Sequence, residues 1–151
     1  MRKLSFCLLV VFSLQMACTV SRNSTPSSIG IVPLQGFSAR GQISLQDTVL
    51  KVYRNDAEFE SAFNASPATT KKPDFYGQMA VAVMTTVSST MEFVKAETAG
   101  NKVNIYLESC TPSTQTSCQS GNLFLAAIPK VGSAKTVVLY IDNKNRRTVN
   151  L

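Results

Sequence analysis

Hydrophobic and polar residues alternate along residues 103–108, where Val103, Ile105 and Leu107 are each followed by a polar or amphipathic residue. A period of two predicts a β-strand with one buried face and one wet face. Residues 79–84 and 123–128 are apolar without interruption, which is typical of central strands covered on both faces. The complete set of predicted strands is Thr48–Arg54, Gln78–Thr86, Met91–Thr98, Val103–Ser109, Asn122–Ile128 and Lys135–Ile141, with a weaker one at Phe37–Leu45.

One of these strands, Met91–Thr98, lacks a clean polar face, so its pattern is the least regular. The residues that follow it, Ala99, Gly100 and Asn101, are typical of a hairpin loop leading into the strand that starts at Val103. These two strands are therefore predicted to pair antiparallel.

A single short helix is predicted after the first of the strong strands. Asn55 is a favoured N-cap, Glu58 stands three residues later as in a capping box, and Phe59 and Phe63 lie on one helical face. The helix ends by Pro67 and covers one face of the sheet. The fold class is therefore α+β, with an antiparallel sheet of about five to seven strands and one short helix.

The first eighteen residues carry a targeting signal: Arg2 and Lys3, an apolar run from Leu4 to Leu14, and Ala17 before Cys18. This order predicts a secretory signal peptide over residues 1–17, because the apolar run is too short to span a bilayer. A cysteine after the small residue resembles a bacterial lipobox, in which Cys18 receives a diacylglyceryl group, although Gln15 occupies the usual Leu position. An ordinary signal peptide with an unmodified Cys18 is the alternative.

Residues 18–36 are predicted to form a flexible tether, since residues 19–28 are small or polar and contain Pro26. Residues 37–151 then form a single domain of common size. No acidic cluster follows Cys18, which favours a position in the cell envelope, on the outer membrane and facing the periplasm.

Charge and composition exclude several function classes. The chain has no histidine, which removes Ser-His-Asp and Cys-His nucleophile systems and the commonest zinc ligands. No calcium-loop spacing or glycine-rich phosphate loop occurs, so no catalytic residue, metal or cofactor is predicted; a Ser-Lys dyad remains open. Removing Arg2 and Lys3 with the signal leaves thirteen basic against nine acidic residues, a net charge of +4. This excess lies in loops and the C-terminal segment and predicts no nucleic-acid binding.

The four cysteines have different predicted fates. Cys7 lies in the signal peptide and Cys18 at the lipidation site, so only Cys110 and Cys118 remain in the domain. In an oxidising compartment they are predicted to form one disulfide that closes a polar loop. A redox role is the alternative, although their spacing is not Cys-x-x-Cys.

The order of features resembles the PrcB-type protease complex subunit family over about residues 48–142. The resemblance rests on the strand end Val52–Asn55, the helix Asp56–Phe63, Pro73–Phe75 ahead of an apolar strand, and the late strand Leu123–Lys130. It implies a lipoprotein that associates with and stabilises a secreted protease, and it carries over no catalytic residues. The chain departs from the family at Ser88–Phe93, where members have a Gly-Gly-Tyr stretch.

The resulting prediction is a non-enzymatic lipoprotein, anchored to the membrane by its lipid, that binds an exported protein, with a secreted protease as one candidate. The predicted contacts are Phe93, Tyr106 and the Thr111–Ser117 loop, because aromatic side chains on a wet strand face can dominate an interface. Tyr106 filling a sheet face without a partner is the alternative to that role. A small-ligand binder or an enzyme with an unrecognised site, and a structural envelope module, are the alternative functions.

Overall fold

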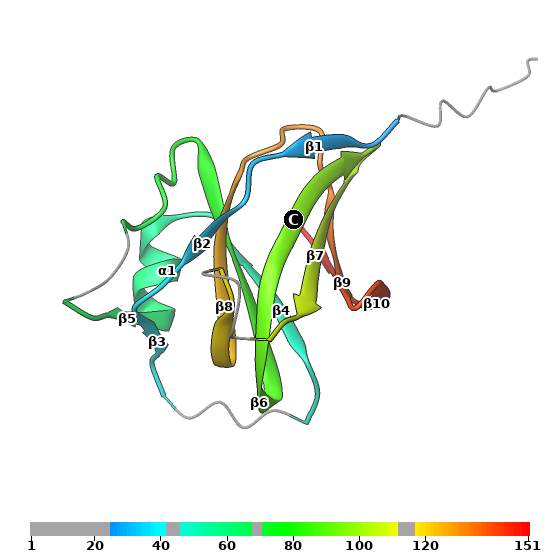
Figure 1. The fold of residues 1–151 in the computed structure, drawn as a ribbon. Coiled ribbons are helices and arrows are strands. Elements are labelled where there is room, and N and C mark those ends of the chain that lie inside the picture. The colour runs from blue at the N-terminus through cyan, green and yellow to red at the C-terminus, as the bar shows by residue number, and fades with distance from the viewer. Residues whose placement is uncertain (1–24, 42–45, 68–70, 112–116) are drawn as a thin grey trace, which may run out of the picture.

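The computed structural model describes residues 25–41, 46–67, 71–111 and 117–151. The elements follow one another as β1 (Ser27–Ile29), β2 (Val32–Leu34), β3 (Phe37–Ala39), β4 (Val49–Tyr53), α1 (Asp56–Ala62), β5 (Phe63–Ala65), β6 (Gln78–Ala99), β7 (Lys102–Ser109), β8 (Gln119–Pro129), β9 (Thr136–Ile141) and β10 (Lys144–Asn150) (Figure 1). The α+β class and the mainly antiparallel pairing are confirmed. The strands outnumber the five to seven predicted, since one sheet has eight and β3 and β5 form another.

The long strand β6 organises the eight-stranded sheet. Its first half pairs with β4 and β8, and its second half pairs with β1 and β7 and, at Ser89 and Thr90, again with β8. The register with β8 shifts between Met84 and Ser89, so the two halves belong to different parts of the sheet. Beyond β7, the parallel strand β9 and then β10 extend the sheet, while β2 borders β8.

The first half of β6 is covered on both faces, as its unbroken apolar sequence predicts. Met79, Val81 and Val83 belong to the main core, which also takes side chains from β7, β8 and β9. Ala80 and Ala82 point the other way and share a second core with α1. Small side chains on that face let the helix lie close to the sheet.

The helix begins where the capping pattern predicts. The Asn55 side chain accepts a hydrogen bond from the Glu58 amide at 2.9 Å, and the Glu58 carboxylate accepts one from the Arg54 amide at 3.3 Å. The only helical residue that is fully buried is Phe59, which the rings of Phe37, Tyr53, Phe63 and Phe75 surround at centroid distances of 4.9 to 6.0 Å. The aromatic cluster fixes α1 against the sheet.

The two strands predicted at Gln78–Thr86 and Met91–Thr98 are one continuous element. The irregular hydrophobic pattern of residues 91–98 has a local cause, because the pairing of β6 with β7 shifts register between Phe93 and Lys95. One extra residue, Val94, is left outside the ladder as in a β-bulge, so Phe93 and Ala96 both point into the core. The hairpin turn between β6 and β7 lies at Gly100 and Asn101, as predicted.

The predicted tether over residues 18–36 is wrong in its second half, where β1 and β2 join the sheet. Ser27 pairs with Thr98 of β6, and Leu34 is buried in the core beneath α1. Small polar residues can extend a sheet because the ladder uses only backbone groups. The strand predicted at Phe37–Leu45 is shorter in the structure, where β3 covers Phe37–Ala39. Residues 42–45 of this prediction, the predicted signal peptide and Cys18 lie outside the described residues.

Candidate functional site

The outer side of β6, β7 and β9 carries an ordered group of aromatic and charged side chains. Because Val103, Ile105 and Leu107 of β7 point into the core, the residues between them point outward. The parallel register sets Tyr106 of β7 opposite Tyr140 of β9. Their rings stack with centroids 4.9 Å apart and planes 12° from parallel.

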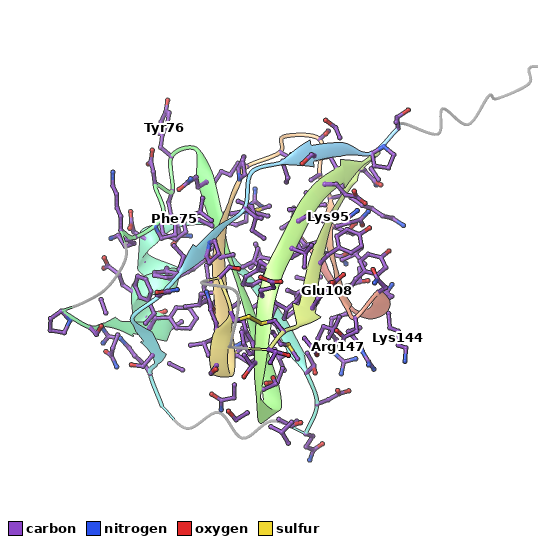
Figure 2. All side chains as sticks on the ribbon, viewed as in Figure 1. Phe75, Tyr76, Lys95, Glu108, Lys144 and Arg147 are labelled. Carbon is purple, nitrogen blue, oxygen red and sulfur yellow. A yellow bond between two sulfur atoms is a disulfide. The ribbon has the colours of Figure 1, made fainter. Side chains whose placement is uncertain are left out.

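Two charged residues of β6, Lys95 and Glu97, complete this group. The four residues Lys95, Glu97, Tyr106 and Tyr140 are called the tyrosine face. The ammonium of Lys95 lies 4.3 Å from the centroid of the Tyr106 ring, in a cation–π contact. The Tyr106 hydroxyl donates to Glu97 Oε1 at 2.7 Å, and Lys95 donates to Glu97 Oε2 at 3.1 Å. Lys95 of this face and Glu108, two residues after Tyr106 on β7, are labelled in Figure 2. The Tyr106 ring is therefore held from several directions.

These contacts set the protonation states of the face. The hydrogen bond to Glu97, then partial burial, raises the pKa of Tyr106 to about 12. The same hydrogen bond from Tyr106, followed by that from Lys95, lowers the pKa of Glu97. At neutral pH the phenol is thus neutral and the carboxylate ionised. The arrangement is suited to recognition by an amphipathic surface, since its donor and acceptor already satisfy each other.

Of the two aromatic contact residues predicted from the sequence, only Tyr106 lies on an accessible face. The prediction for Phe93 is wrong, because its side chain is 8% exposed and belongs to the main core. The bulge at Val94 turns Phe93 inward. Sequence reasoning missed Tyr140, because only the parallel pairing of β7 with β9 shows that it lies beside Tyr106.

The predicted cysteine pair is brought together near the middle of β6. The sulfur atoms of Cys110 and Cys118 lie at disulfide distance, with their Cα atoms 6.2 Å apart. The Cys110 amide donates to the Thr90 carbonyl at 3.1 Å, and the Ser117 hydroxyl donates to Glu92 at 2.5 Å. These bonds attach both ends of the predicted contact loop to β6. Residues 112–116 of that loop lie outside the described residues.

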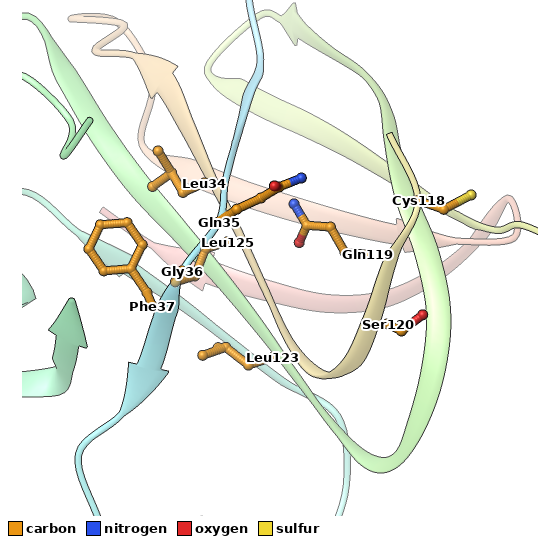
Figure 3. Close-up of a pocket in the computed structure, with 9 residues that line it drawn as sticks. All are labelled: Leu34, Gln35, Gly36, Phe37, Cys118, Gln119, Ser120, Leu123 and Leu125. Carbon is orange, nitrogen blue, oxygen red and sulfur yellow. The ribbon is translucent and has the colours of Figure 1, made fainter. Parts of the chain in front are cut away.

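Two hollows lie on the other side of the sheet. The first, of about 320 Å³, is bounded by β2, β3 and the start of β8, and Figure 3 shows the Gln119 amide directed toward the Gln35 side chain. Among the described residues, the buried Nε2 atom of Gln119 has no hydrogen-bond partner. The second hollow, of about 470 Å³, lies between α1 and the β3–β5 pair, with Phe37, Phe59 and Phe63 in its wall and Arg40 at its rim.

Within residues 25–41, 46–67, 71–111 and 117–151, no group of three or more Cys, Asp and Glu side chains could hold a metal ion. No helix in these ranges is long and apolar enough to cross a bilayer. Comparisons with known protein families, with curated proteins and with solved structures found no match to this chain.

Proposed function

We propose that this protein is a non-enzymatic lipoprotein of the bacterial cell envelope, and that it binds an exported protein as an accessory or stabilising subunit. The observation that carries the proposal is the stacked pair Tyr106 and Tyr140 on an accessible sheet face. Tyrosine is enriched in the residues that dominate protein interfaces, because it combines a large apolar area with one polar group. The resemblance to PrcB-type subunits supports a secreted protease as the partner.

The contacts around Tyr106 support this role through preorganisation. A side chain that is free in solution loses rotamer entropy on binding, at about 0.5 to 1.5 kcal/mol for each immobilised residue. Here Tyr140, Lys95 and Glu97 already hold the Tyr106 ring. A partner that packs on this ring therefore gains contact area with less ordering cost. The charge of Glu108, on the same strand as Tyr106, offers a polar contact at the edge of such an interface.

Site-specific photo-crosslinking in intact cells tests the binding face. A benzophenone amino acid in place of Tyr140 keeps an aromatic ring at the face, and the same group in place of the exposed Ser61 of α1 is the matched control. We expect a discrete exported protein crosslinked from position 140 and absent at position 61. The variant Tyr106→Ala/Tyr140→Ala should lose that protein on co-purification. Equal products at both positions, or none at position 140, would contradict the proposal.

Membrane attachment through Cys18 is a separate part of the proposal with its own test. The Cys18→Ser chain should leave the membrane fraction, because no acyl chains can then be attached at this position. The matched control is Cys7→Ser, which removes a thiol within the predicted signal peptide. A Cys18→Ser protein that still sediments with membranes would show that the lipid prediction is wrong.

The hollow at Gln119 favours a second candidate function, the binding of a small polar molecule. The buried amide nitrogen without a partner among the described residues could donate to a ligand oxygen there. Native mass spectrometry of the chain purified from its own cells tests this. A small molecule retained by the natural chain and lost in Gln119→Leu would support this function in place of protein binding.

A further inference from the structure

One end of the domain brings together the start of β1, the turn before β6, the β6–β7 hairpin and the loop between β8 and β9. Thr98 next to the hairpin pairs with Ser27, and the Asn101 carbonyl accepts the Lys135 amide at 2.8 Å. At the other end of the same loop, the Lys130 amide donates to the Gly77 carbonyl at 2.9 Å. This continuous edge is called the basal rim. Figure 1 shows its parts at the same end of the molecule.

The basal rim carries the most exposed large hydrophobic side chain among the described residues. Tyr76 is 97% exposed, and Figure 2 shows it directed away from the body of the protein. Its turn is nevertheless well held. The Tyr76 amide donates to the Asp74 carboxylate at 3.1 Å, and the Lys130 ammonium donates to the Phe75 carbonyl at 2.5 Å. A fixed turn therefore presents a tyrosine ring to the surroundings.

The charge of the basal rim is positive. Lys102, Lys130 and Lys135 are exposed along it. Of the carboxylates beside it, Asp74 accepts from the backbone of the tyrosine turn, and Glu97, next to Thr98, is paired with Lys95. Lysines near an anionic lipid surface each contribute favourable electrostatic energy, and tyrosine rings are enriched at the level of lipid headgroups. The rim thus combines the two residue types that suit an anionic bilayer surface.

The position of the predicted anchor selects the bilayer as the occupant. Because β1 begins at Ser27, only nine residue steps separate it from Cys18, which span at most about 32 Å. The part of the domain nearest a membrane that holds Cys18 is therefore the part around Ser27, which belongs to the basal rim. We infer that the basal rim docks on the headgroups of an anionic lipid bilayer, with Tyr76 at the interface. This inference rests on the proposed lipid anchor.

In this orientation the tyrosine face is left accessible to a partner beside the membrane. Tyr106 and Tyr140 lie along the flank of the sheet, on β7 and β9, rather than at the rim. Docking of the rim would fix the direction in which that face points. The lipid contact and the protein contact then use separate surfaces of one domain.

The absence of tryptophan from the chain provides a direct test. Tyr76→Trp introduces a single tryptophan reporter at the rim. Val87→Trp places the matched control in β6 between Met84 and Ser89, where the register shifts and Val87 is 68% exposed. Each full-length lipidated chain is reconstituted into phosphatidylethanolamine and phosphatidylglycerol vesicles that contain lipids brominated near the headgroup. We expect quenching and a blue shift for the reporter at position 76 and neither change at position 87.

Charge removal tests the electrostatic part. Lys102→Gln/Lys135→Gln in the Tyr76→Trp chain should lower the ratio of docked to undocked molecules by about twentyfold or more, at about fivefold for each lysine. The matched control, Lys144→Gln/Arg146→Gln, removes the same charge from β10 and should change little. Neutral phosphatidylcholine vesicles should reduce the quenching in the same way as the rim variant.

The outcomes separate the rim from the anchor. Chains that float with the vesicles while both reporters are unquenched, or equally quenched, would overturn the docking of the rim and leave the lipoprotein proposal standing. Chains that do not float with the vesicles would overturn the anchor, and the rim inference would fall with it.

Discussion

The side chain of Arg147 in β10 donates from Nε to the carbonyl oxygen of Thr48, next to β4, at 2.6 Å. The two residues are 99 positions apart, and the same guanidinium pairs with the Asp47 carboxylate. No backbone ladder joins β10 to β4 in the described sheet. Arg147 therefore supplies a side-chain link between β10, the last strand, and the start of β4.

We expect Arg147→Ala to lower the free energy of unfolding by about 1 to 2 kcal/mol, since it leaves a carbonyl oxygen without its charged donor. The neighbouring Arg146→Ala is the control, because that side chain is exposed, and it should change stability by less than about 0.5 kcal/mol. Urea unfolding followed by circular dichroism measures both. Equal effects of the two substitutions would show that the link to Thr48 contributes nothing.

The bulge in β6 makes two adjacent residues differ sharply in their contribution to stability. Phe93 is 8% exposed in the main core, whereas Val94 is 47% exposed. We expect Phe93→Ala to cost about 3 to 5 kcal/mol through lost burial and a cavity. Val94→Ala should cost less than about 0.5 kcal/mol. Thermal unfolding compares the two, and similar losses would contradict the placement of the bulge.

Because Cys110 and Cys118 lie at disulfide distance, we expect the free energy of unfolding to depend on whether the pair is oxidised or reduced. A bond between Cys110 and Cys118 closes a short loop, which corresponds to about 2 to 3 kcal/mol in the chain-entropy estimate. Cys110→Ser and the Cys110→Ser/Cys118→Ser double variant should lose the same amount, because either change opens the loop. Intact-mass analysis of periplasmic material alkylated without reductant should show both thiols protected. Two labelled thiols would exclude the disulfide and favour the redox alternative.

Much of the fold could be predicted because local patterns and tertiary packing agree there. The alternation from Val103 to Leu107 and the unbroken apolar run in the first half of β6 both reflect which faces are covered. The helix start at Asn55 follows from hydrogen bonds within four residues. These features depend on short stretches of chain, so the sequence alone contains the information.

The parts that could not be predicted depend on contacts between distant strands. A bulge at Val94 shifts the period by one residue, and nothing in the local composition distinguishes it from an irregular strand. The short strand β1 has one apolar residue, Ile29, and its position depends on backbone pairing with β6 and on the packing of Ile29 against the main core. The candidate site could be predicted only in part for the same reason. The strand pattern of the sequence identifies Tyr106 as an outward residue, but only the parallel pairing of β7 with β9 shows that Tyr140 lies beside it.

The pKa of Tyr106 offers a test of the tyrosine face that does not need a partner. Its value of about 12, raised from 10.0 first by the hydrogen bond to Glu97, means that the folded protein holds this proton more tightly than the unfolded chain. Stability from this contact is therefore complete below about pH 10 and is lost as the pH rises through about 12. We expect a late-ionising phenol in a rapid pH-jump titration of phenolate absorbance.

Glu97→Gln should move that late ionisation back toward the ordinary tyrosine value, because the neutral amide no longer favours the protonated phenol. Tyr106→Phe should remove it entirely, and this variant assigns the signal among the four tyrosines of the chain. Tyr53→Phe is the control for the other tyrosine with a raised pKa, which arises first from burial, and it should leave the Glu97-dependent change intact. A late phase that is unaffected by Glu97→Gln would contradict the hydrogen bond on which the ordered tyrosine face depends, because that bond is the largest cause of the shift.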